Sequence, residues 1–206
     1  MSHKNKVFVV DDHPMICRGL RDFLNEQENL VFCGEANNLT NALAMIPKIQ
    51  PDILILDLSI GNRSGLELIK ELKSKGELPL TLVLSIYDEL IYAERCVKIG
   101  ARGYMMKTRP IEEILEAIQK MLQGEMAISP SAATHMIKRM SHEQEQSKKI
   151  PTTDEEIAAM LSDRELHVFE LIGQGHSVKK NRGYSSFKRQ NCGDLSDAYF
   201  AKTRCS

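Results

Sequence analysis

Five short, almost continuously apolar runs constrain the fold of this chain more than any other feature of its sequence. They cover residues 7–10, 30–33, 53–56, 81–84 and 103–106. Short runs of this kind are typical of strands buried on both faces of a parallel sheet. Segments with helical periodicity follow at residues 16–24, 39–46, 66–72, 90–99 and 111–122, the last with Pro110 at its start. The alternation predicts an α/β fold, a (βα)5 doubly wound parallel sheet with helices on both faces.

Polar side chains follow four of these runs, at the point where each predicted strand ends. Asp11 and Asp12 follow the first run, Asp57 the third, Ser85 the fourth and Lys107 the fifth. In an open parallel sheet, ligands bind beyond the carboxyl ends of the strands, where the strand order reverses. We therefore expect these five side chains to converge on one rim of the sheet.

The residue types at this rim are suited to phosphoryl transfer. Three converging carboxylates repel one another unless a cation offsets their charge, and an all-oxygen cluster suits Mg²⁺. An aspartate beside Mg²⁺ can attack a phosphoryl group in line, which places Asp57 as the nucleophile and Ser85 and Lys107 on the phosphoryl oxygens. Each residue alone is explained as readily by a turn, a helix cap or a solvated lysine. Their joint placement on separate strand ends is what favours a site.

Four stretches of the chain resemble the receiver domains of two-component response regulators. They are residues 11–14 (D-D-H-P), 52–59 with 65–67, 84–89 and 100–107. The resemblance spans residues 5–122 and implies a flavodoxin-like receiver domain with these bounds. The first and last stretches are similar to the NarL/FixJ branch, whose members are DNA-binding transcription regulators. Residues 61–64 depart from the family, which commonly has a Met-Pro turn after the acceptor loop.

The resemblance implies that Asp57 is the phosphoacceptor and that Mg²⁺ is the cofactor. The metal ligands would be Asp12, Asp57 and the carbonyl oxygen of Ser59, with Asp11 assisting through water. The chain would not be an enzyme in its own right, beyond its own phosphorylation and dephosphorylation. A Mg²⁺-dependent phosphatase is a further hypothesis, but it needs a second acid two residues after Asp57, where Ser59 stands.

The resemblance assigns the remaining site residues to phosphoryl binding and to switching. Ser85 and Lys107 would bind the phosphoryl oxygens. Tyr104 matches the family's switch aromatic, whose rotamer follows the hydroxyl of the Ser85 position. Packing against the sheet edge explains an aromatic residue at Tyr104 equally well, so the switch role stays open at this point.

A linker and the beginning of a second domain follow the predicted receiver. Residues 123–156 are rich in Ser, Pro, Met and charge and read as a linker, with a short helix at residues 131–140. Ser162 and Glu165 then fit a capping box ahead of an apolar periodic segment. Residues 157–180 resemble the start of a LuxR-type helix-turn-helix, an all-α domain that places a recognition helix in the major groove.

The last segment, residues 181–206, does not continue that domain. It contains one Leu and no Val, Ile or Met, so it lacks the apolar stripe that a packed recognition helix needs. Back-translation one base out of register permits a string that resembles the missing helices. We therefore expect an extra nucleotide in the codons of Lys179 and Lys180, with a truly divergent tail as the alternative. In either case the tail is expected to be disordered and to contribute no DNA-binding residue.

The receiver resemblance and the loss of the recognition helix together suggest partners for this chain and two competing functions. A sensor histidine kinase would phosphorylate Asp57, and a homodimer would form through residues 90–99, 103–106 and 111–122 or through the helix-turn-helix remnant. The family controls transcription by binding DNA, and specific DNA binding is not expected of this chain because its recognition helix is lost. The alternative is a receiver without working output that acts as a phosphate sink or a protein-interaction switch.

Composition adds one expectation about location. The formal net charge is −1, so any nucleic-acid binding has to come from a local basic patch. The five cysteines show no C-x-x-C pair, and no stretch approaches the roughly 20 apolar residues of a membrane span. We expect a cytoplasmic protein that does not insert into a membrane.

Overall fold

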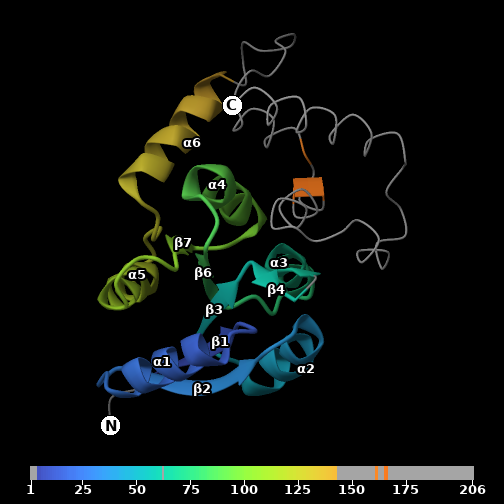
Figure 1. The fold of residues 1–206 in the computed structure, drawn as a ribbon, viewed down its shortest axis with the longest axis vertical. Coiled ribbons are helices and arrows are strands. Elements are labelled where there is room, and N and C mark those ends of the chain that lie inside the picture. Colours follow the sequence, from blue (N-terminus) through green and yellow to red (C-terminus); the bar gives the residue numbers. More distant parts are fainter. Residues whose placement is uncertain (1–3, 62, 143–160, 162–164, 167–206) are drawn as a thin grey trace, which may run out of the picture. The chain divides into compact units, whose positions relative to one another are not determined.

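The protein forms an α/β domain in which helices and strands alternate along the chain (Figure 1). The structure, a computed structural model, describes residues 4–61, 63–142, 161 and 165–166, all within a compact unit at residues 1–166. The strands are β1 (Asn5–Val10), β2 (Leu30–Ala36), β3 (Ile53–Asp57), β4 (Ser59–Ile60), β5 (Arg63–Ser64), β6 (Leu80–Ser85) and β7 (Gly103–Met106). The helices are α1 (Pro14–Asn25), α2 (Leu39–Ile49), α3 (Gly65–Ser74), α4 (Glu89–Ile99), α5 (Glu112–Leu122) and α6 (Pro130–His142).

Five parallel strands form the central sheet, in the order β2-β1-β3-β6-β7. The predicted doubly wound sheet is therefore confirmed, and each predicted strand lies within a strand of the structure. The order reverses between β1 and β3, because the chain adds β2 on one side of β1 and later strands on the other. This reversal leaves the carboxyl ends of β1 and β3 side by side, where a ligand site is expected.

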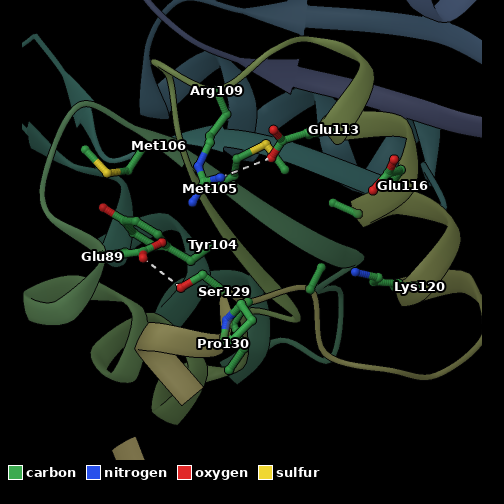
Figure 2. A pocket seen from close by; sticks show the side chains of 13 residues that line it. Glu89, Tyr104, Met105, Met106, Arg109, Glu113, Glu116, Lys120, Ser129 and Pro130 are labelled. Carbon is green, nitrogen blue, oxygen red and sulfur yellow. Dashed lines mark hydrogen bonds and ion pairs between the residues drawn. The ribbon is translucent and has the colours of Figure 1, made fainter. Parts of the chain in front are cut away.

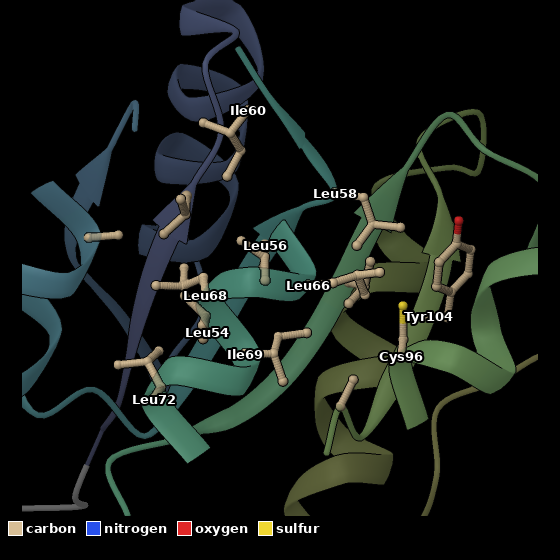
Figure 3. Close-up of a cluster of buried hydrophobic side chains, with 14 of the residues drawn as sticks. Leu54, Leu56, Leu58, Ile60, Leu66, Leu68, Ile69, Leu72, Cys96 and Tyr104 are labelled. Atoms are coloured by element: carbon tan, nitrogen blue, oxygen red, sulfur yellow. The ribbon is translucent and has the colours of Figure 1, made fainter. Parts of the chain in front are cut away.

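Both faces of the sheet are buried, which explains why its strands are apolar without alternation. In β1 and β3 the odd-numbered residues Val7, Val9, Ile53 and Ile55 pack in a cluster with α1 and α5. The even-numbered residues Phe8, Val10, Leu54 and Leu56 pack with α2, α3 and α4. Figure 3 shows part of the second cluster, where β3 faces the apolar side of α3. Each face thus has its own core.

Two features of this domain were not predicted from the sequence. A short antiparallel hairpin, β4 with β5, follows the third strand and pairs Ser59 with Ser64 and Ile60 with Arg63. The segment after α5 also adds to the sheet, because Ala127 bridges Gly103, accepts a backbone hydrogen bond from Tyr104 and donates one to Arg102. Within the described residues, no helix combines the length and apolar character needed to cross a membrane.

Helix α6 confirms the short helix expected near residues 131–140, and it packs against α4. Glu94 of α4, only 4% exposed, pairs with Lys98 at 2.5 Å and with Arg139 of α6 at 2.9 Å. Ser129 and Ser131 donate hydrogen bonds of 2.7 and 2.8 Å to Glu89 Oε1 at the start of α4, and Figure 2 shows Ser129 meeting Glu89 beside a hollow. The charged run after α6 lies outside the described residues, so the predicted bounds of the linker and of the second domain stay predictions.

We expect Arg139→Ala to loosen α6 from α4. The substitution removes a cation from the buried Glu94 carboxylate, and a buried group that loses a partner costs about 1–3 kcal/mol. Hydrogen exchange of the α6 amides should accelerate, while the amides of β3 should keep their protection. Ile137→Ala on the same helix is the matched control, since Ile137 is 68% exposed. Equal exchange in the two variants would show that the ion pair does not hold α6.

Candidate functional site

The predicted rim exists, and the sheet topology builds it. Asp11 and Asp12 follow β1, Asp57 ends β3, and the carboxylates of all three lie close together with the ring of His13. One ligand atom from each of these four residues lies within 4.8 Å of every other. The prediction that Asp11, Asp12 and Asp57 converge is confirmed, and His13 is an addition that sequence reasoning did not assign.

Lys107 is held between two of the carboxylates. Its Nζ lies 2.6 Å from Asp11 Oδ2 and 2.7 Å from Asp57 Oδ2, and its side chain is 9% exposed. Burial alone would lower the pKa of the ammonium, but the hydrogen bonds and charges of Asp11 and Asp57 raise the pKa above its ordinary value. Lys107 is therefore a permanent cation of this site and not a solvated surface lysine.

Asp57 is a buried carboxylate, 3% exposed, at the end of the central strand. Its Oδ2 accepts a hydrogen bond from Lys107, and its Oδ1 accepts one of 3.2 Å from the Ser59 N–H. Burial raises the pKa of the Asp57 carboxyl, Lys107 opposes that rise, and the neighbouring charge of Asp11 adds to it. The carboxylate is oriented by two donors in an environment that disfavours its charge.

The two carboxylate oxygens of Asp12 differ in their hydrogen bonds to the described residues. Its Oδ2 accepts a hydrogen bond of 2.8 Å from the N–H of Gly61, in the β4–β5 turn. Its Oδ1 is buried and has no partner with hydrogen-bond geometry among the described residues, although His13 Nδ1 lies 3.0 Å away. A buried carboxylate oxygen without a hydrogen bond is available to a cation or a water.

This set of residues fits a hard divalent cation. Among the described residues, Lys107 is the one ammonium paired with this cluster, through Asp11 and Asp57, which leaves an excess of two negative charges if all three carboxyls are ionised. The donors are carboxylate oxygens, the ligands that Mg²⁺ prefers. The carbonyl oxygen of Ser59 stays a predicted ligand.

Ser85 is linked to Tyr104 through two hydrogen bonds made by the backbone of Tyr87. The buried Ser85 ends β6, and its Oγ accepts a hydrogen bond of 3.2 Å from the N–H of Tyr87. The carbonyl oxygen of Tyr87 accepts a hydrogen bond of 2.9 Å from the Tyr104 hydroxyl. Tyr104 is 3% exposed and lies on β7, so it packs inside the domain in this structure. Its predicted switch role stays a prediction.

Two glycines place the acceptor segment, for reasons that only the structure reveals. A Cβ on Gly65 would lie 2.3 Å from the carbonyl oxygen of Asp57, closer than real Cβ contacts come. Gly61 has a φ of 59°, in the left-handed region that glycine adopts without strain. Gly65 therefore allows α3 to begin directly beside Asp57, and Gly61 turns the hairpin so that its N–H reaches Asp12.

The part of the chain that carries this site also matches known proteins. Residues 7–119, more than half of the chain, match the family model of the response regulator receiver domain. The chain belongs to the response-regulator receiver family. This response regulator is 33% identical over 133 residues to the uncharacterized transcriptional regulatory protein YvfU of Bacillus subtilis, an alignment that covers 65% of this chain and 66% of YvfU. It is 28% identical to the nitrate/nitrite response regulator protein homolog of Haemophilus influenzae, covering 87% of this chain and 81% of the relative.

A solved structure shows the same fold. The two-component response regulator of the LuxR family from Aurantimonas sp. matches with a TM-score of 0.61 and 24% identity, covering 67% of this chain and 99% of that one. The match to the receiver-domain family model confirms the resemblance to response regulators drawn from the sequence motifs. The chain is a two-component response regulator, and the relatives named above include a regulator of transcription.

Proposed function

We propose that Asp57 accepts a phosphoryl group from a sensor histidine kinase. The observation that carries this proposal is the Asp57 carboxylate itself, which is buried, paired with Lys107 and placed beside Asp12, whose Oδ1 has no hydrogen-bond partner in the described part of the chain. Mg²⁺ bound by Asp12, Asp57 and the Ser59 carbonyl, with Asp11 acting through water, would neutralise charge on the transferring oxygens. The residues present suit that metal.

The transfer balances with groups that this chain and the kinase supply. An Asp57 oxygen attacks the phosphorus of a phosphohistidine, a P–O bond forms, and the P–N bond breaks. The departing imidazole nitrogen keeps the electron pair and takes a proton from solvent. Lys107 stays within reach of the new phosphoryl oxygens, and Ser85 supplies a hydroxyl to the same group. We expect the chain to be phosphorylated and dephosphorylated only on Asp57. It should therefore not hydrolyse unrelated phosphate esters repeatedly.

The proposed switch runs from Ser85 to Tyr104 and on to the segment before α6. If the Ser85 hydroxyl turns to a phosphoryl oxygen, the N–H of Tyr87 loses its acceptor, and the Tyr104 hydrogen bond to the Tyr87 carbonyl is strained with it. Tyr104 also donates its backbone N–H to the carbonyl oxygen of Ala127 at 2.9 Å. A rearrangement of β7 would therefore displace the segment that leads into α6.

The proposed output is control of transcription in the cytoplasm, with a homodimer formed through α4, β7 and α5 or through the helix-turn-helix remnant. Because α6 packs on α4, a dimer that uses the covered part of α4 requires α6 to move.

A second candidate function is favoured by the composition of residues 181–206, which have a single Leu and no Val, Ile or Met. On that account the chain is a receiver without DNA-reading output that serves as a phosphate sink or a protein-interaction switch.

Phosphorylation by acetyl phosphate with and without Mg²⁺ tests the proposal. We expect the intact mass to rise by one phosphoryl group with Mg²⁺ and to stay unchanged with EDTA. Mg²⁺ at 100 times its dissociation constant should also stabilise the fold by about 2.7 kcal/mol. Labelling of equal extent in EDTA would contradict the metal's role.

Footprinting on promoter DNA separates the two candidate functions. Only a transcription regulator should protect a defined site on the DNA, whereas a phosphate sink or protein-interaction switch should protect none.

A further inference from the structure

His13 places a ring nitrogen inside the carboxylate cluster. Its Nδ1 is hydrogen-bonded to Asp11 Oδ1 at 2.9 Å, and it lies 3.0 Å from Asp12 Oδ1 and 4.0 Å from Asp57 Oδ2. The backbone N–H of His13 also donates a hydrogen bond of 2.9 Å to Asp11 Oδ1. The side chain thus faces three carboxylates from one side, although 62% of it is exposed.

The ring is not needed for the structure of the helix that follows. His13 is the N-cap residue of α1, yet its side chain makes no capping hydrogen bond, and Pro14 at the first turn fixes the backbone there. The two nearby oxygens differ in their other partners. Asp11 Oδ1 already accepts the His13 N–H, whereas Asp12 Oδ1 is buried and has no partner with hydrogen-bond geometry among the described residues.

Two of these distances match the spacing of ligands around one cation. In an octahedral site with bonds of about 2.1 Å, neighbouring ligands lie about 3.0 Å apart and opposite ligands about 4.2 Å apart. Nδ1 stands at the neighbouring distance from Asp12 and close to the opposite distance from Asp57, the two carboxylates that would bind the metal directly. A small cation held by Asp12 and Asp57 would therefore lie within reach of the ring.

We infer that His13 is a nitrogen ligand of the metal site, and that it shifts the preference of the site from Mg²⁺ towards Mn²⁺. The inference rests on the proposed function, because it concerns the same metal. Mg²⁺ prefers an all-oxygen shell, while an imidazole ligand favours first-row transition ions. His13 is in this respect a specificity-determining residue for the metal and takes no part in the attack on phosphorus.

Pulsed electron paramagnetic resonance on the full chain loaded with Mn²⁺ tests the inference. A directly bound imidazole produces ¹⁴N modulation of the Mn²⁺ signal. The modulation should be present in the wild-type protein, change to a ¹⁵N pattern when histidine is labelled, and vanish in His13→Gln. This variant exchanges a nitrogen donor for an oxygen donor at an exposed N-cap without a side-chain capping bond, so its fold should persist, which circular dichroism checks.

Calorimetry supplies a second readout and separates the possible failures. His13→Gln should lower Mn²⁺ affinity more than about tenfold, since even outer-shell substitutions lower metal affinity by about 10–100-fold, and Mg²⁺ affinity much less. Asp12→Ala should abolish the binding of both ions. Mn²⁺ binding that depends on Asp12 but shows no ¹⁴N modulation, or modulation that survives in His13→Gln, overturns the inference and leaves the proposed function intact. Metal binding that is unchanged in Asp12→Ala overturns both the His13 inference and the proposed function.

Discussion

Asp57→Asn is expected to abolish phosphorylation completely, whether the donor is a kinase or acetyl phosphate. Asparagine keeps the size of the side chain but has no nucleophilic carboxylate, so no P–O bond can form at this position. Intact mass spectrometry after incubation with acetyl phosphate and Mg²⁺ measures the effect. Asp22→Asn is the control, because Asp22 is an exposed residue of α1. It should be labelled like the wild type.

The loss in Asp57→Asn should not come from unfolding. Because burial raises the pKa of Asp57, the folded state binds its proton more tightly than the unfolded state does. Stability from this group is therefore present at low pH and is lost as pH rises through the folded pKa, so the ionised carboxylate costs stability at neutral pH. Asparagine removes that cost, and Lys107 keeps Asp11 at 2.6 Å. Without Mg²⁺, the variant should melt no lower than the wild type at pH 7. A clearly lower melting temperature would contradict this.

Gly65→Ala is expected to have the largest effect on stability. The new Cβ would meet the backbone carbonyl oxygen of Asp57 at 2.3 Å and the Cα of Leu58 at 3.2 Å, and a backbone cannot turn aside as a flexible side chain can. Overpacking of this kind costs about 1–3 kcal/mol. The displaced acceptor segment should also slow labelling by acetyl phosphate. Urea unfolding followed by circular dichroism gives the first quantity, and the time course of the mass increase gives the second.

Gly19→Ala is the matched control for Gly65→Ala. Gly19 lies within α1, and a Cβ there would have no atom within 4 Å. Alanine in a helix interior is favoured over glycine by about 0.5–1 kcal/mol, so this variant should be more stable than the wild type. If both alanines shift the free energy of unfolding by the same amount, the close approach of Gly65 to Asp57 has no energetic consequence.

The sequence predicts the central sheet well because burial on both faces leaves no room for polar residues in its strands. Val7, Val9, Leu54 and Ile55 follow directly from that constraint. The same reasoning places Asp11, Asp12 and Asp57 together, because parallel strands end on one rim. The β4–β5 hairpin could not be predicted in this way, because two-residue strands have no hydrophobic pattern. Its turn also depends on the positive φ of Gly61.

Contacts between distant segments are the other part that the sequence does not predict. The pairing of Glu94 with Arg139 joins α4 to a helix 45 positions later, and either residue alone reads as a solvated charge on a helix surface. His13 belongs to a motif that carries the family resemblance, but the motif does not show that its ring turns towards Asp12. Side-chain direction is set by tertiary packing, which periodicity does not encode.

Chemical trapping of the acyl phosphate tests the central claim most directly. Borohydride reduces an aspartyl phosphate to homoserine, so peptide mapping of the phosphorylated protein identifies the acceptor residue. The account predicts that homoserine replaces Asp57 alone, in proportion to the mass increase, and only when Mg²⁺ is present. Homoserine at Asp11 or Asp12, or a mass increase without any conversion at Asp57, would contradict it.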